Sequence, residues 1–186
     1  MADFTPTRIR MTREEFMALP ETTTPHELIN GELIVSPTPK DPHQGVIISM
    51  LRVLLRLVST GTFRVAPMEV HFDDGNIVEP DIFWVSGSDS KCKLGEDGYW
   101  YGAPDLMIEV LSPSTEARDR REKFNLYQQH GVREYWLVHP EALFIEVFTL
   151  TEGEFLRKGL FEINQTFYSD VLGQTIEVNA ILGGQE

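Results

Sequence analysis

The chain has 186 residues, of which 41% are hydrophobic and 24% charged, and its formal net charge is −13 at pH 7. This composition is ordinary for a soluble globular protein, and the length allows one domain with a substantial core, so we expect a single domain over residues 1–186. The longest apolar stretch, residues 45–58, is interrupted by Arg52 and Arg56. This excludes a membrane span, which needs roughly 20 consecutive apolar residues.

Two features favour a cytoplasmic location. Residues 1–6 lack the basic-then-apolar pattern of a secretory signal. The single cysteine, Cys92, has no partner for an internal disulfide and no neighbours at metal-site spacing. We therefore expect a protein of the reducing cytoplasm with no membrane association.

The distribution of charge bears on nucleic acid as a partner. Proteins bind phosphate backbones by neutralising them with Lys and Arg, and an acidic chain lacks that general attraction. Residues 65–111 contain ten acids and two lysines, whereas residues 118–133 contain five Lys or Arg and two acids. The basic segment directly follows the acidic one, so DNA stays a candidate partner although charge alone does not indicate it.

The amino-terminal part of the chain begins with well-defined local signals. Thr12-Arg13-Glu14-Glu15 is typical of a capping box and predicts a helix that ends by Pro20. Asn30-Gly31 lies between two short apolar runs, which predicts a hairpin over residues 26–35. Apolar residues at three- and four-residue spacing then predict a helix over residues 43–58.

The remaining pattern predicts an α/β fold. We expect strands at 63–72, 77–85, 106–111 and 134–138, a loop at 86–102, a helix from about 115 to His130, and a late hairpin of 143–150 with 155–161. The middle of the chain is thus a helix, three strands, a helix and a strand. This order favours a central mixed sheet with helices on both faces and extra hairpins at the two ends of the chain.

Two acids lie in otherwise apolar segments. Asp81 follows Pro80 at the start of a predicted strand, and Glu109 lies inside the apolar strand 106–111. A buried carboxylate needs a partner or a metal, and a divalent cation held by oxygen atoms would account for both acids. The alternatives are a loop cap for Asp81 and a structural ion pair with Arg118 or Lys123 for Glu109. The sequence does not fix the strand register that decides whether the two acids meet.

Lys123 lies two turns into the helix that follows the Glu109 strand, where it can reach back over the sheet. A lysine there would stabilise a developing negative charge or orient a water molecule. Because Asp119 precedes it by four residues, a solvent-exposed helical ion pair is the alternative.

Further site residues are less clearly indicated by the sequence. Glu32 and His43 are candidate additional ligands, against the alternatives of a solvated turn acid and a helix cap or surface histidine. Arg118, Arg120 and Arg121 form either a phosphate-contacting patch or a solvated helix face.

An ordered series of motifs resembles the Uma-two family, a bacterial group of restriction-endonuclease-like proteins on the PD-(D/E)XK nuclease scaffold. The resemblance covers roughly residues 12–150. It rests on His-Glu-Leu-Ile-Asn-Gly-Glu-Leu at 26–33, Pro-His-Gln at 42–44, Glu-Pro-Asp-Ile at 79–82, the segment 103–115, and the segment from Lys123 to Pro140. The stretch from Pro104 to Pro140 is the most specific part.

The resemblance implies a restriction-endonuclease-like fold and a site for Mg²⁺ or Mn²⁺, which the sequence does not distinguish. By motif position, Asp81 and Glu109 would be the metal ligands, with the Val110 carbonyl as a third. The scaffold usually places its lysine two residues after the second acid, but that residue is Leu111 here. Lys123 would be the substitute, and Glu32 and His43 would be additional members of the site.

The function expected from the resemblance is Mg²⁺-dependent hydrolysis of DNA phosphodiester bonds by an endonuclease. Two alternatives stay open: a non-catalytic interaction module that retains the fold, and a hydrolase of a small phosphorylated substrate. The scaffold often acts as a dimer, so we also expect a homodimer or higher homo-oligomer. Phe144, Ile145, Phe155 and Phe161 of the late hairpin would cover a partner or fill the core of one subunit.

Overall fold

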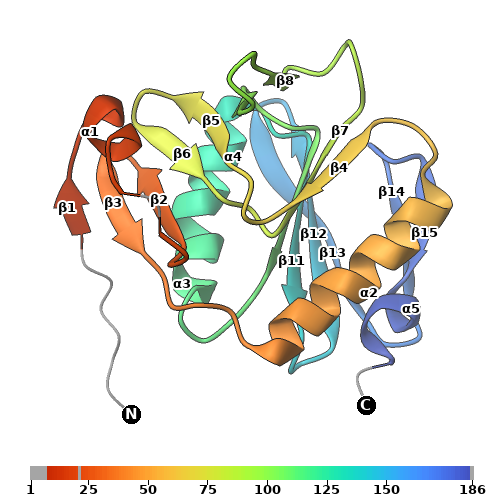
Figure 1. Ribbon diagram of the computed structural model, residues 1–186. Helices are drawn as coiled ribbons and strands as arrows, with labels where there is room; N and C mark the ends of the chain where they lie inside the picture. Colours follow the sequence, from red (N-terminus) through yellow and green to blue (C-terminus); the bar gives the residue numbers. More distant parts are fainter. Residues whose placement is uncertain (1–7, 21, 185–186) are drawn as a thin grey trace.

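The computed structural model describes residues 8–20 and 22–184, so the segment 1–6 that lacks a secretory pattern lies outside the described residues. Its main layer is a six-stranded mixed sheet (Figure 1). The strand order is β13 (Glu154–Glu162), β12 (Phe144–Thr151), β11 (Glu134–His139), β10 (Leu106–Val110), β7 (Ile82–Val85) and β4 (Thr62–Val65). Among the described strands of this sheet, only β10 and β11 pair in parallel, because the helical segment between them carries the chain back to the end of the sheet where β10 began.

A second sheet contains the amino-terminal hairpin. Its order is β1 (Arg8–Arg10), β3 (Glu32–Val35), β2 (His26–Ile29), β6 (Asn76–Val78), β5 (Val70–Asp73), β9 (Trp100–Tyr101) and β8 (Lys93–Leu94). The predicted Asn-Gly hairpin is confirmed: Asn30 and Gly31 have φ of 53° and 72°, as a type I′ turn requires. The predicted loop 86–102 thus contains two short strands.

The two strands predicted at 63–72 and 77–85 are each divided between the sheets, which corrects the sequence-based prediction. The first becomes β4 and β5, and the second becomes β6 and β7. Pro67 and Pro80 lie at the breaks, where an imide nitrogen cannot donate a hydrogen bond to a strand ladder. Only β5 and β6 form the predicted hairpin.

The helices follow the predicted pattern with shifted ends. The capping box of Thr12 and Glu15 is present and opens α1 (Arg13–Met17). Helix α2 (Asp41–Leu57) begins two residues earlier than expected, with Pro42 in its first turn, where proline is favoured. His43 therefore lies within the first turn of α2.

The helix predicted from 115 to His130 is interrupted. It consists of α3 (Glu116–Arg118), a π-helical turn η1 (Asp119–Lys123) and α4 (Phe124–His130), and Gly131 ends it with a φ of 84° as predicted. Single π-helical turns often occur at functional sites. Here the turn contains Lys123.

Side chains on the two faces of the six-stranded sheet form separate cores. On one face, residues of β7, β10 and β11 pack against α2 and α5 (Val178–Leu182). On the other face, the sheet packs against α4 and residues of the second sheet (Figure 1). The predicted α/β architecture with helices on both faces is confirmed.

The carboxyl-terminal part combines a predicted and an unpredicted element. The late hairpin forms as β12 and β13, and β14 (Thr166–Ser169) and β15 (Gln174–Glu177) follow as a separate two-stranded sheet. Ile145 and Phe155 are buried, and Phe161 packs against the core beside α2. These side chains fill the subunit's own core, and the homo-oligomer stays a prediction. Among the described helices, none combines the length and the apolar character that crossing a bilayer requires.

Candidate active site

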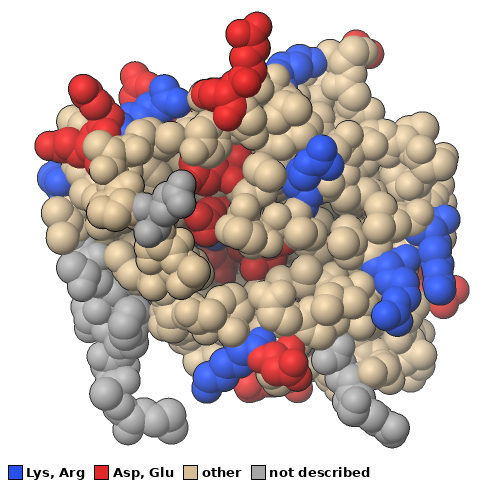
Figure 2. Space-filling view, in the orientation of Figure 1, with Lys and Arg blue, Asp and Glu red and all other residues tan. Residues whose placement is uncertain are grey.

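A cavity of about 640 Å³ opens where the two sheets, the start of α2 and the helix after β10 come together. Asp81, Glu109 and Lys123 all line it, as does His43. Figure 2 shows acidic side chains gathered in the hollow at the centre of this face, with mainly uncharged residues around its mouth. Convergent ionisable groups in a concave site indicate function, so this cavity is the candidate active site.

Asp81 and Glu109 occupy opposing positions on neighbouring strands. β7 and β10 pair antiparallel with Ile82 opposite Ile108, so the next pair along the ladder is Asp81 and Glu109. The Val110 N–H donates to Asp81 Oδ2 at 2.7 Å, which fixes the Asp81 carboxylate against β10. The register that the sequence left open is therefore the one that brings the two acids together.

Both acids lie on the sheet face that is turned toward the helix after β10. Phe83 and Met107 pack into the core on that face. Side chains alternate along a strand, so residues two apart point to the same side. Asp81 therefore points to the same side as Phe83, and Glu109 to the same side as Met107. Glu109 is only 3% exposed, so its carboxylate lies at the bottom of the cavity.

Lys123 is part of a buried ion-pair network. Its side chain is 2% exposed, and Nζ lies 2.9 Å from Glu109 Oε1, 2.8 Å from Glu27 Oε1 and 3.8 Å from Asp119 Oδ1. The Tyr127 hydroxyl donates to the same Glu109 oxygen at 2.7 Å. The exposed helical pair with Asp119, kept open as an alternative, is therefore wrong: the pair exists but is buried.

Glu27 is the functional candidate that the sequence analysis missed. It lies on β2 and is held by the Glu79 N–H, which donates to Oε1 at 3.0 Å, while Arg118 Nη2 lies 3.5 Å from Oε2. The available signal was its position inside a predicted strand, directly before the apolar residues Leu28 and Ile29. Glu32 was named instead because the family resemblance implied a site member at that position.

The structure does not bring Glu32 to the cavity. Glu32 lies at the start of β3, where its carboxylate is 4.0 Å from Arg10 Nε, and it is absent from the described residues that line the cavity. Glu27 pairs with Ile34 and lies nearer the open end of the hairpin, away from the turn. The prediction of Glu32 as a site member is thus replaced by Glu27 on geometric grounds.

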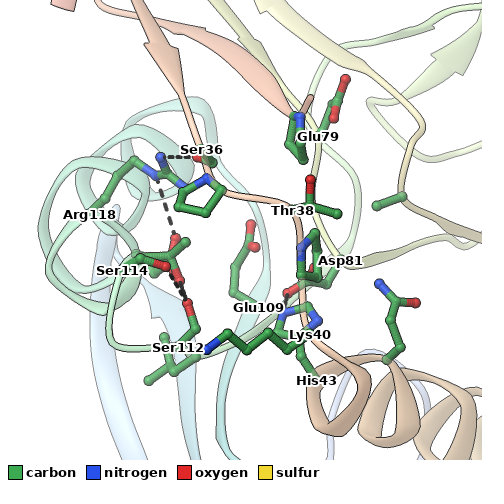
Figure 3. Close-up of a pocket in the computed structure, with 18 of the residues that line it drawn as sticks. Ser36, Thr38, Lys40, His43, Glu79, Asp81, Glu109, Ser112, Ser114 and Arg118 are labelled. Atoms are coloured by element: carbon green, nitrogen blue, oxygen red, sulfur yellow. Dashed lines mark hydrogen bonds and ion pairs between the residues drawn. The ribbon is translucent and has the colours of Figure 1, made fainter. Parts of the chain in front are cut away.

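His43 contacts Asp81 from the first turn of α2. Its Nε2 lies 3.2 Å from Asp81 Oδ2, and its side chain is 13% exposed (Figure 3). Burial lowers the pKa of His43, but the hydrogen bond and charge of Asp81, together with the backbone of Val110, raise the pKa more, so the net shift is upward. His43 thus favours the charged form and holds Asp81 in place.

The backbone of Val110 therefore interacts with both Asp81 and His43. That the Val110 carbonyl is a metal ligand stays a prediction.

The three arginines do not form a free phosphate-contacting patch. Arg118 is buried against Glu27 and donates to the Ser36 hydroxyl at 2.7 Å. Arg120 forms ion pairs with Glu116 and Glu146. Arg121 is exposed and does not line the cavity.

The pKa shifts follow from burial and crowding of charge. Burial raises the pKa of Glu109; Asp119, Asp81 and Glu27 raise it further, and Lys123 offsets only part of this. Burial lowers the pKa of Lys123, but Glu109, Glu27 and Asp119 raise it more, so the net pKa lies above its ordinary value. Lys123 therefore remains an ammonium ion and serves as a fixed positive charge.

The charges of this cluster fit a divalent cation. Its carboxylates are Glu27, Asp81, Glu109 and Asp119, and its permanent cations are Lys123 and Arg118. Carboxylates thus outnumber the permanent cations of the cluster, and their mutual repulsion helps to raise the pKa of Glu109 and of Asp119. Asp119 Oδ1 is buried without a hydrogen-bond partner among the described residues, as is Glu27 Oε2. A cation at the cavity floor would offset this excess, because buried charges require compensation.

The donor set resembles an open Mg²⁺ site more than a closed metal cage. Within the described part of the chain, no group of three or more His, Cys, Asp or Glu is arranged to hold a metal ion. Mg²⁺ is commonly bound by one or two carboxylates, with water and substrate phosphates as the other ligands. Asp81 and Glu109 meet that requirement.

The chain matches a known protein family over most of its length. A family model named Uma2 and described as "Putative restriction endonuclease" matches residues 13–179. The chain belongs to the Uma2 family. The match extends beyond residue 150, so it includes the carboxyl-terminal elements that follow the motifs. No curated protein matches the chain.

A solved structure with the same fold supports the architecture of this Uma2 member. It is the crystal structure of a "putative nuclease" from Anabaena variabilis, with a TM-score of 0.77, 22% sequence identity, and coverage of 95% of this chain and 99% of that chain. The predicted restriction-endonuclease-like fold is thereby confirmed. In this Uma2 chain, Leu111 lines the cavity at the position where the usual motif has lysine. Lys123 of the π-helical turn η1 instead forms the ion pair with Glu109.

Proposed function

We propose that this Uma2 member is a divalent-metal-dependent nuclease that hydrolyses DNA phosphodiester bonds. The observation that carries the proposal is the convergence of Asp81, Glu109 and Lys123 in one cavity, with Glu109 Oε1 2.9 Å from Lys123 Nζ. Two carboxylates beside an ammonium group suit phosphoryl chemistry, where charge develops on phosphate oxygens. Membership of a family described as restriction endonucleases supports the same reaction.

Each residue has a distinct part in this proposal. Asp81 and Glu109 would hold Mg²⁺ or Mn²⁺, with the Val110 carbonyl as a third ligand. The ion would supply Lewis acidity and help to activate water. His43 orients Asp81 through their contact of 3.2 Å. These residues together define where the scissile phosphate lies.

Lys123 stabilises the negative charge that develops on the phosphate oxygens. Its raised pKa keeps it protonated, so it acts as a charge and hydrogen-bond donor and does not remove a proton from water. Glu27 contacts the same ammonium group at 2.8 Å and helps to hold it in place. We infer that Glu27 is a positioning residue.

The test uses circular DNA, which only internal cleavage can linearise. The full chain is incubated with supercoiled duplex plasmid and with circular single-stranded DNA, in MgCl₂, in MnCl₂ and in EDTA. We expect metal-dependent linearisation of at least one circle, and a loss of at least about 100-fold in Glu109→Gln, the size typical of losing a group that acts on the reacting charge.

A matched control is Glu32→Gln, which changes an acid of the amino-terminal hairpin outside the cavity. It should cleave like the parent, which shows that replacing an acid by its amide does not by itself abolish activity, and the loss in Glu109→Gln purified in the same way excludes a contaminating nuclease. Failure to cut either circle, or equal cleavage by Glu109→Gln, would contradict the proposal.

A further inference from the structure

Resting on the proposed nuclease function, we infer that the cavity takes an unpaired, single-stranded segment of a few nucleotides, and that little of the binding comes from cation–phosphate pairs. The size of the cavity, the charge of its lining and the nature of its walls all favour this substrate class for the proposed active site.

The size of the cavity suits a few nucleotides. Its volume of about 640 Å³ falls within the roughly 300–1,000 Å³ of pockets that enclose small ligands. Recognition of duplex DNA instead uses a broad, positively charged surface of about 1,000–2,500 Å². The acids lie at the bottom of the hollow, not on an open face (Figure 2). A phosphate can reach Glu109 only when its strand enters the cavity.

The lining of the cavity carries more acidic than cationic side chains. Lys40, Arg118 and Lys123 are the cationic Lys and Arg among the described lining residues, and acids outnumber them. Arg118 and Lys123 are already engaged with carboxylates. Lys40 is exposed, and its ammonium group has no ion pair or hydrogen bond with any described residue. One ammonium group is thus available to a substrate phosphate.

The walls of the cavity are apolar and rich in hydroxyl groups. Seven prolines line it, and Pro37, Pro39 and Pro113 belong to two segments, 36–39 and 112–115, that also carry serine and threonine hydroxyls. Figure 3 shows Thr38 on one side of Glu109 and Ser112 and Ser114 on the other.

Proline fixes the backbone dihedral φ, which makes such walls stiff. Stiff walls on both sides of Glu109 oppose the widening that a duplex would need.

The chemistry of these walls defines how a strand would be held. Hydroxyls hydrogen-bond to phosphate, sugar and base edges without releasing counterions. No Phe, Tyr or Trp is found among the described lining residues, so base stacking on aromatic rings is not available inside the cavity. A base pair must open before its phosphate reaches the floor, and opening is least costly where the strand is already unpaired.

The experiment measures affinity as well as cleavage. A fluorescein-labelled 15-nucleotide strand and the same strand annealed to its complement are titrated with the full chain by fluorescence anisotropy, in CaCl₂, from 50 to 200 mM KCl. Ca²⁺ takes the same oxygen ligands as Mg²⁺ with more flexible geometry. Gels run after each titration check that the DNA is intact, and cleavage of both DNAs is then measured in MgCl₂ and MnCl₂.

We expect the single strand to bind at least tenfold more tightly than the duplex. Its log K should fall with log[KCl] with a slope near −1, because one lysine contributes about −0.7 on single-stranded DNA. Lys40→Met should remove about that much of the slope. Arg56 is an exposed residue near the other end of α2, so Arg56→Met should leave the slope unchanged.

The outcomes separate this inference from the function on which it rests. Duplex that is bound or cut as well as the single strand, or a salt slope steeper than about −4, would overturn the inference and leave the nuclease function standing. If neither DNA is bound or cut, the proposed function fails and the inference fails with it.

Discussion

Lys123 Nζ lies between two carboxylates from different parts of the chain, 2.8 Å from Glu27 Oε1 on the amino-terminal hairpin and 2.9 Å from Glu109 Oε1 on the central sheet. One buried ammonium group therefore joins the second sheet, the π-helical turn and the six-stranded sheet. It also supplies a positive charge beside Glu109 in a chain that lacks a lysine two residues after that acid.

Glu27→Gln tests whether Glu27 positions Lys123. The amide keeps the size of the carboxylate but loses its charge, so Lys123 is held less firmly while Glu109 and Asp119 still compensate it. We expect kcat to fall about 10–100-fold, the range for groups that orient a metal-site residue, with KM within a few-fold of the parent. Steady-state kinetics on the preferred DNA measures this.

Glu32→Gln is the matched control for Glu27, since both acids lie on strands of one hairpin but only Glu27 lines the cavity. Circular dichroism and urea unfolding of both variants check that each folds. A Glu27→Gln protein with parental kcat would show that Glu27 is only structural.

Moving the lysine from position 123 to position 111 tests whether activity requires an ammonium group beside Glu109, whichever residue supplies it. Lys123→Met should reduce kcat by at least about 100-fold, because a fixed positive charge is lost from the reacting phosphate. Leu111 lines the cavity two residues after Glu109. Adding Leu111→Lys to Lys123→Met should restore about tenfold of the lost activity. Activity unaffected by Lys123→Met would remove the lysine from the mechanism.

Metal binding is the third prediction. Calorimetric titration of Mg²⁺ or Mn²⁺ into metal-free protein should give saturable binding, which Asp81→Asn and Glu109→Gln abolish. Because a ligand stabilises the state that binds it, a concentration of 100 times Kd should add about 2.7 kcal/mol to the free energy of unfolding.

The surface variant Asp41→Asn, an exposed acid in the first turn of α2, should bind metal like the parent. Removal of metal with EDTA should reverse the stabilisation. Equal heats for the parent and Asp81→Asn would place the cation elsewhere.

The acid dependence of stability is the fourth prediction, and it concerns Asp105, outside the cavity. Its Oδ2 accepts from the Ser86 N–H at 2.8 Å, and its Oδ1 accepts from Arg133 at 3.2 Å. Burial raises the pKa of Asp105, but the hydrogen bonds from Ser86, Ser90 and Arg133 lower it more, so the net shift is downward.

A lowered pKa in the folded state means that ionised Asp105 stabilises the protein above its unfolded pKa of about 3.9. That contribution is lost as the pH falls through the lower pKa of the folded state. Asp105→Asn should therefore lower the free energy of unfolding by about 1–3 kcal/mol at pH 7. The difference from the parent should shrink at pH 3.5. Urea unfolding at both pH values measures it, and a constant difference would contradict the assignment.

Local signals in the sequence predicted most of the elements correctly. The capping box of Thr12 and Glu15, the Asn30-Gly31 turn and the glycine stop at Gly131 are all decided by neighbouring residues. The strand divisions at Pro67 and Pro80 were missed because apolar residues lie on both sides of each proline, so each segment resembles one longer strand. Which sheet each half joins depends on distant strands.

What the sequence determined by itself is the set of residues with unusual chemistry in apolar surroundings, namely Asp81 and Glu109, and the order of helices and strands around them. Hydrophobic period and turn residues are local properties, so they can be recognised without the fold. The tertiary structure alone decided three relationships: the register that sets Asp81 opposite Glu109, the burial of Lys123, and the choice of Glu27 over Glu32. Each depends on contacts between segments far apart in the chain, whose energies no local pattern contains.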